Sequence, residues 1–204
     1  NGSTATTAAI KLSRAYTNRT LIARCAEQPF FSYDDWFIGS TPLTKGIPQK
    51  DIDSTKMFNY NNIESLKKLF DEYPDQIACV ILEPASTEHP KDNFLHKVQE
   101  LCHKNGAVFI LDEMITGFRW HLKGAQHYYN IKPDLCTFGK AMANGFSVAA
   151  IAGRREIMEL GSIEFEGRER LFLLSTTHGA EMSGLGAFVE TMKFMKDNNV
   201  VEHI

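Results

Sequence analysis

Residues 76–83 read Gln-Ile-Ala-Cys-Val-Ile-Leu-Glu, and residues 107–112 read Ala-Val-Phe-Ile-Leu-Asp. Both runs are apolar without polar alternation, which is typical of strands that are buried on both faces of a sheet. Between them, Lys91–Asn105 has the periodicity of a helix, and Gly106 follows it as a C-terminal cap. This strand–helix–strand unit predicts an α/β fold in three layers, a mostly parallel sheet with helices on both faces.

The rest of the chain alternates between helical and strand periodicity. Residues 26–57 show neither; they are rich in aromatic residues, Pro and Gly, and we expect a long loop there, which in a compact domain is often functional. We expect further helices at Ala5–Tyr16, Asn61–Tyr73 and Glu181–Lys196, and further strands at Leu21–Cys25, Leu135–Phe138, Val148–Ala152 and Leu171–Leu174.

The composition narrows the class of protein. The 204 residues are enough for one sizeable core. The net charge of −3 gives no basic surface for nucleic acid or an anionic membrane, and the longest apolar runs are too short to span a bilayer. The four cysteines are scattered without zinc-ligand spacing, which favours a reducing, cytoplasmic setting. The chain does not begin with Met, and we expect residues 1–204 to be a fragment of a longer protein that holds only part of one domain.

Acidic residues end two of the predicted strands, and a lysine follows a third. Glu83 and Asp112 lie at the carboxyl ends of strands, where ligands bind in parallel sheets. Lys140 lies 28 residues after Asp112, among small residues such as Gly139 and Ala141 that would let a flat ring approach. Such a lysine and acid suit a pyridoxal phosphate (PLP) enzyme. The lysine would form a Schiff base with the cofactor aldehyde, and the aspartate would keep the pyridine nitrogen protonated.

Each of these features also has an ordinary structural interpretation. An acid at a strand end commonly forms a structural salt bridge, which the neighbouring Glu113 and Arg119 could supply, and a lysine is by default a surface residue. Asn1–Thr6 lead into the first helix, where free N–H groups bind anions, but Ser and Thr are favoured as N-caps in any case. The aromatic residues Phe30 and Trp36 either pack in a core or stack on a ring.

Taken together, these segments resemble the class III (fold type I) PLP-dependent aminotransferases, and among them the glutamate-1-semialdehyde 2,1-aminomutase branch. The resemblance keeps the same order and spacing through nearly the whole chain. It rests on the Ser/Thr-rich start at 1–14, the Glu-Pro turn at 82–84, the strand end at 111–119, the lysine segment at 133–140 and the stretch at 153–158. Arg119 directly after Phe118 and the run Gly124-Ala125-Gln126 favour the aminomutase branch.

The resemblance implies an enzyme that transfers amino groups. Lys140 and Asp112 would be catalytic, Lys140 as the Schiff-base lysine and proton shuttle and Asp112 as the partner of the pyridinium. The cofactor contacts would be Gly2 and Ser3 on the phosphate, Met114 and Phe30 on the two faces of the ring, and Glu83, Asp112, Lys140 and Thr176.

The same resemblance implies partners. Thr176 corresponds to a threonine that reaches the phosphate from a neighbouring subunit, which implies a homodimer with a shared active site. The substrate would be a small amino, aldehyde or keto-acid molecule. Residues 85–89 lack the asparagine that the family carries after its Glu-Pro turn. Amino transfer between adjacent carbons and transfer to a separate keto acid therefore both stay open.

Two other classes of function compete with this interpretation. A non-catalytic protein of the same fold, serving as a binding or regulatory module, is less favoured because Lys140 and Asp112 are both present. A generic nucleotide-binding α/β domain is disfavoured because neither GxGxxG nor GxxxxGK[ST] follows a predicted strand.

Overall fold

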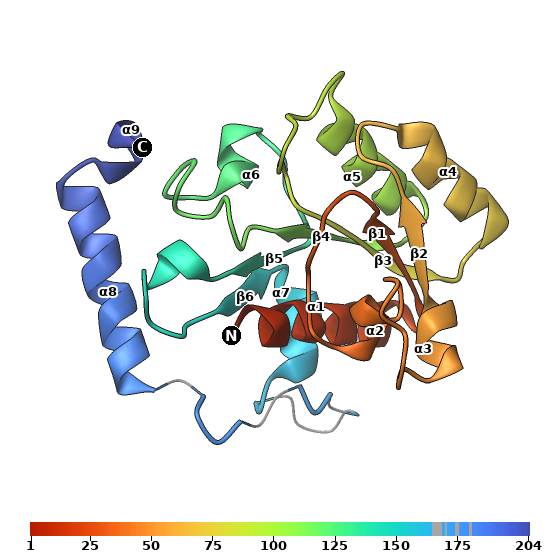
Figure 1. The fold of residues 1–204 in the computed structure, drawn as a ribbon, viewed down its shortest axis with the longest axis horizontal. Helices are drawn as coiled ribbons and strands as arrows, with labels where there is room; N and C mark the ends of the chain where they lie inside the picture. The colour runs from red at the N-terminus through yellow and green to blue at the C-terminus, as the bar shows by residue number, and fades with distance from the viewer. Residues whose placement is uncertain (165–168, 170, 174–175, 180) are drawn as a thin grey trace.

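The protein folds around one six-stranded sheet (Figure 1). The computed structural model describes residues 1–164, 169, 171–173, 176–179 and 181–204. Within these residues the strands are β1 (Leu21–Cys25), β2 (Thr55–Phe58), β3 (Ile77–Leu82), β4 (Val108–Asp112), β5 (Leu135–Phe138) and β6 (Ala150–Gly153). Their order across the sheet is β2-β1-β3-β4-β5-β6. Neighbours from β2 to β5 are parallel, and β6 runs antiparallel to β5.

Helices connect and cover the strands. They are α1 (Gly2–Thr17), α2 (Asp35–Ile38), α3 (Gln49–Ser54), α4 (Ile63–Glu72), α5 (Phe94–Lys104), α6 (Ala125–Tyr128), α7 (Arg155–Met158), α8 (Met182–Asp197) and α9 (Val200–His203), with short 3-10 helices η1 (Lys140–Met142) and η2 (Glu159–Gly161). Figure 1 shows α8, in blue, at the opposite side of the molecule from α4 and α5. In the described part of the chain, no helix combines the length and the apolar character needed to cross a membrane.

Two hydrophobic cores lie on the two faces of the sheet. One joins α4 and α5 to strand side chains such as Val80 and Leu111. The other joins α1 and α7 to Ile81 and Ile110, which are adjacent to Val80 and Leu111 in the same strands. Successive strand residues point to opposite faces, and each fully buried aliphatic or aromatic side chain contributes about 1.5–3 kcal/mol. Because β3 and β4 are buried on both faces, the predicted three-layer α/β fold is confirmed.

The first helix begins at Gly2 rather than at Ala5, where its apolar periodicity starts. The cause is the cap at Asn1, whose Oδ1 accepts hydrogen bonds from the Thr4 N–H at 3.1 Å and from Thr4 Oγ1 at 3.0 Å. One of the amide groups that every helix leaves free at its start is thereby satisfied. The Ser/Thr-rich start is therefore the first turn of α1 and not a turn before it.

The expectation of one long loop over residues 26–57 is wrong in part. The segment contains α2, α3 and the edge strand β2, whose Thr55 pairs with Ile22 of β1. These short elements are held by distant contacts. Trp36 Nε1 donates to Thr7 Oγ1 at 3.0 Å, and Thr55 Oγ1 donates to the Trp36 carbonyl at 2.6 Å. Trp36 is 5% exposed and is thus a core residue.

The strand expected at Leu171–Leu174 is not formed where the structure describes it. Residues 171–173 are neither helix nor strand, and Leu174 lies outside the described residues. Other elements differ from expectation by a few residues at their ends, as with β6, which begins at Ala150 instead of Val148. The helices α6 and α7 have four residues each, too few for periodicity to reveal them.

Candidate active site

The carboxyl ends of β3, β4 and β5 lie side by side, and alternate side chains there face α1. Ile81 and Ile110 belong to the core beneath α1. Because strand side chains alternate between faces, the next members of this series, Glu83 and Asp112, point to the same side. Asp112 in turn pairs with Thr137 across the ladder to β5. The α1 face of the sheet therefore ends in two neighbouring acids.

Asp112 is a buried carboxyl group that receives two hydrogen bonds on one oxygen. Its Oδ1 accepts from the Met114 N–H and from Thr137 Oγ1, each at 2.9 Å. The other oxygen has no hydrogen bond from any described residue, and the side chain forms no ion pair with one. Burial raises the pKa of Asp112 to about 6, although both hydrogen bonds and the positive charge of Lys140 lower it. A cation beside the free oxygen would stabilise the ionised form.

Glu83 directly follows β3 and is 5% exposed. Its Oε2 is buried and has no hydrogen-bond partner among the residues that the structure describes. Burial first, and then the charge of Asp112, raise the pKa of Glu83 to about 7, while Lys140 lowers it. Buried polar atoms without a partner are rare in native proteins, so this oxygen indicates a place for a ligand.

Lys140 follows β5, begins η1 and is exposed. Its φ of 44° lies in the left-handed region, which is uncommon for a residue with a Cβ atom. Its positive charge acts on both Glu83 and Asp112. The structure thus brings together the lysine and the two acids that the sequence indicated, without a direct ion pair between them in the described part of the chain.

Met114 lies between the start of α1 and the lysine segment. A Cβ atom at Gly2 would come within 2.9 Å of the Met114 Sδ, and a Cβ atom at Gly139 would come closer still. Gly139 has an extended backbone with φ of −175°, which any residue can adopt. A side chain at Gly139 would therefore require the Met114 side chain to move, and the backbone conformation of Gly139 is not the constraint.

The first turn of α1 offers two backbone N–H groups to a ligand. No described residue accepts a hydrogen bond from the N–H of Gly2 or Ser3, and a helix N-terminus attracts anions. Ser3 Oγ accepts from the Tyr33 N–H at 3.2 Å, which brings the segment with Phe30 to this turn. Phe30 is 54% exposed and packs edge-on against Phe37, with ring centroids 5.6 Å apart. Stacking of Phe30 on a cofactor ring stays a prediction.

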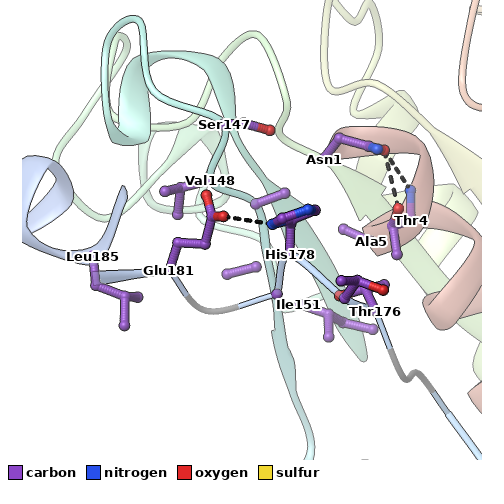
Figure 2. Close-up of a pocket in the computed structure, with 14 residues that line it drawn as sticks. Asn1, Thr4, Ala5, Ser147, Val148, Ile151, Thr176, His178, Glu181 and Leu185 are labelled. Carbon is purple, nitrogen blue, oxygen red and sulfur yellow. Dashed lines mark hydrogen bonds and ion pairs between the residues drawn. The ribbon is translucent and has the colours of Figure 1, made fainter. Parts of the chain in front are cut away.

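A cavity of about 610 Å³ opens beside the same turn (Figure 2). It is lined by the start of α1, by residues 147–151 and by residues 176–179. Figure 2 shows Thr176 beside α1, and His178 paired with Glu181 through a contact of 2.9 Å. Thr176 therefore lines one cavity with α1 of its own chain, and its reach into a neighbouring subunit stays a prediction.

Glu113 has a structural role that the sequence did not indicate. It is fully buried and accepts hydrogen bonds from the N–H groups of Ala125 and Gln126, at the start of α6. Burial raises the pKa of Glu113, and these hydrogen bonds lower it. The salt bridge considered for Glu113 and Arg119 is not formed, because Arg119 donates to the Ile115 carbonyl at 2.7 Å.

Gln28 is a second residue that sequence reasoning missed. Its Nε2 donates to the Glu83 carbonyl at 2.9 Å, and its Oε1 accepts from the Glu83 N–H at 2.8 Å. Gln28 is 1% exposed, so this two-point contact is protected from water. A glutamine in an irregular segment, 55 residues from its partner, carries no signal in the sequence that could reveal this contact.

Comparison with known proteins identifies the family of this chain. The model for aminotransferase class-III matches residues 1–204. The chain belongs to this family. The resemblance that the motifs gave is therefore confirmed over the whole chain.

Relatives within the class-III aminotransferase family are longer. A glutamate-1-semialdehyde 2,1-aminomutase of Thermosipho africanus is 39% identical over 211 residues, which cover 97% of this chain and 48% of that protein. One of Clostridium tetani is 41% identical over 171 residues, which cover 78% of this chain and 40% of the relative. The chain spans about half the length of the curated relatives that it matches or less.

Solved structures of similar proteins have the same fold. The FumI protein of Sphingopyxis sp. MTA144, in its PLP internal aldimine form, superposes with a TM-score of 0.82 at 26% identity, covering 96% of this chain and 46% of that one. An omega-transaminase of Sphaerobacter thermophilus gives a TM-score of 0.82 at 27% identity, covering 96% and 48%. The α/β fold of this family is therefore shared almost throughout the chain.

Proposed function

We propose that residues 1–204 form part of the major domain of an enzyme that transfers amino groups with pyridoxal phosphate, as an aminomutase or a transaminase. The observation that carries this proposal is that the charge of Lys140 acts on the buried Asp112 at the carboxyl edge of the sheet, and that Met114 links this edge to the first turn of α1. Membership of the class-III family supports it. No observation favours the non-catalytic binding module over an enzyme.

The residues at this edge fit the cofactor. PLP carries a phosphate, a ring nitrogen that takes up a proton, and an aldehyde. The unpaired N–H groups of Gly2 and Ser3 suit the phosphate. The free oxygen of Asp112 suits a protonated ring nitrogen, and Met114 offers an apolar surface to the ring. Lys140 supplies the amine that the aldehyde needs.

Each residue has a definite task in such a reaction. When bound, PLP supplies an aldehyde that reacts with amines and a ring that accepts an electron pair. Asp112 would hold positive charge at the ring nitrogen, because a buried carboxylate is stabilised by a cationic neighbour. Lys140 would hold the aldehyde end through its Nζ and, once a substrate amine takes its place, would carry a proton on that nitrogen. The exposure of Lys140 leaves this nitrogen open to substrate.

The partners that we propose follow from the family resemblance. The substrate is a small amino compound, amino aldehyde or keto acid, and the assembly is a homodimer in which Thr176 of one subunit reaches the phosphate held by the other. A cytoplasmic setting is supported by the four cysteines, which are buried and unpaired.

The test is a cofactor titration of the full-length protein. We expect a visible absorption band after addition of PLP, its loss in Lys140→Ala, and its retention in Lys123→Ala, which changes an exposed lysine in the segment before α6. Conversion of the band by an added amino donor would support amino transfer. An unchanged spectrum of the unmodified protein with PLP would falsify the proposal.

A further inference from the structure

Glu83 is held in place by its main chain alone. The two hydrogen bonds from Gln28 fix its N–H and its carbonyl. The second N–H of the Gln28 amide makes no hydrogen bond to the Glu83 carboxyl group in the described part of the chain. Two hydrogen bonds therefore fix the backbone of Glu83, and its acid group has no donor among the residues that the structure describes.

The carboxyl groups of Asp112 and Glu83 differ in the hydrogen bonds that they receive, and this difference favours ionisation of Asp112 before Glu83. Asp112 receives two hydrogen bonds at 2.9 Å, and both favour its ionised form. No described residue donates to the carboxyl group of Glu83, whose Oε2 is buried. A buried carboxylate without donors beside another carboxylate costs far more than a neutral carboxyl group there.

The charges around Glu83 agree with this division. Asp112 at the end of β4 opposes ionisation of Glu83, and Lys140 after β5 favours it more weakly. Tyr60, after β2, donates its hydroxyl proton to the Pro84 carbonyl and not to Glu83. Gln28 brings no charge. The first charged side chain of α1 is Lys11, well beyond its first turn.

We propose that Glu83 keeps its proton while Asp112 is ionised, and that Glu83 donates this proton in a hydrogen bond to an oxygen atom of the molecule bound beside Asp112. The inference rests on the proposed function, since that molecule is PLP or a substrate held with it. The acceptor is a phenolic, carbonyl or carboxylate oxygen. A substrate ammonium group is not the partner of Glu83, because it would require the ionised form.

Infrared difference spectroscopy of the full-length protein tests the protonation directly, without cofactor. We expect a carboxylic-acid carbonyl band that disappears as the pH rises through about 7, that is absent in Glu83→Gln and that persists in Glu100→Gln, an exposed glutamate on α5. Absence of any band that depends on Glu83 would sink the proposal. This measurement is informative whether or not the protein binds PLP.

Addition of PLP tests the donated hydrogen bond. We expect the Glu83 band to move to lower frequency, either with PLP alone, which assigns the acceptor oxygen to the cofactor, or only after an amino acid substrate is also added, which assigns it to the substrate. A band that vanishes on binding at pH 6 would mean that Glu83 is ionised in the complex and would refute the proposal. Lys140→Ala, tested for loss of the visible band, reports separately on the proposed function.

If the acceptor oxygen belongs to PLP, the affinities of two Glu83 variants for PLP provide a further test. Gln is neutral and keeps a hydrogen-bond donor, so Glu83→Gln should change the dissociation constant for PLP by less than about threefold, and Glu83→Ala should raise it about fivefold or more. A loss of tenfold or more in Glu83→Gln would show that the charge of Glu83 is needed, against the proposal. The fold of each variant is checked by its thermal transition.

Discussion

The hydroxyl group of Thr137 donates a hydrogen bond of 2.9 Å to Oδ1 of Asp112. This bond joins β5 to the end of β4 and favours the ionised form of a carboxyl group that burial drives toward protonation. Thr137 is completely buried, so water does not replace the hydroxyl when it is removed. The protonation state of Asp112 therefore depends on Thr137, its neighbour on β5.

Replacement of Thr137 by Val should weaken PLP binding at pH 7 about five- to tenfold, because a hydrogen bond contributes about 1–1.5 kcal/mol. The loss should be larger at pH 6 than at pH 8. Without the donor the pKa of Asp112 rises above about 6, and the higher pH restores the carboxylate. Absorbance titrations at the two pH values measure this. Thr137→Ser keeps the hydroxyl group and should bind nearly as the unmodified protein does, whereas a Val variant with unchanged affinity at both pH values would contradict the role of Thr137.

Gly139→Ala should destabilise the protein by about 1–3 kcal/mol, because its Cβ atom would overlap the Met114 thioether. A second change, Met114→Ala, removes the overlapping atoms, so the double variant should lose less stability than the sum of the single variants. Urea denaturation of the four proteins measures this coupling. Strictly additive losses would show that Met114 does not limit the space at Gly139.

Glu113→Gln should lower the free energy of unfolding by about 1–3 kcal/mol. The carboxylate accepts from two backbone N–H groups at the start of α6 through its two oxygens, and an amide would turn an NH2 group toward one of them. Urea denaturation of the variant and of Glu100→Gln, which alters an exposed side chain, gives the comparison. Equal stability of the two variants would mean that Glu113 does not hold this segment.

The elements that the sequence predicts well are those whose apolar runs are continuous. β1 and β5 have the bounds that their patterns predict, and the acids at the ends of β3 and β4 lie on one edge, as strand ends in a parallel sheet must. Lys140 reaches the same edge because β5 is the next strand of the ladder. Local patterning and the topology of parallel sheets were sufficient for these residues.

The features that the sequence did not predict depend on contacts between distant segments. β2 has four residues and, among the described strands, pairs with β1 alone, and α2 is held through the contact of Trp36 with Thr7. The hydrogen bonds between Gln28 and the Glu83 backbone join segments 55 residues apart. No local periodicity encodes such pairs, since each partner alone is an ordinary polar or aromatic residue.

The stability of the cofactor-free protein should fall as the pH rises from about 4.5 to about 7, through the contribution of Glu83. Its folded pKa of about 7 exceeds the ordinary value of 4.5, so the folded state binds the proton more tightly than the unfolded state does. This contribution is complete below about pH 4.5 and is lost as the pH passes the folded pKa. At about 1.4 kcal/mol per pKa unit it amounts to about 3 kcal/mol. Subtracting the unfolding free energies of Glu83→Gln from those of the unmodified protein between pH 5 and pH 8 gives this contribution together with that of the coupling between Glu83 and Asp112. A difference that stays constant over this range would show that Glu83 titrates alike in both states.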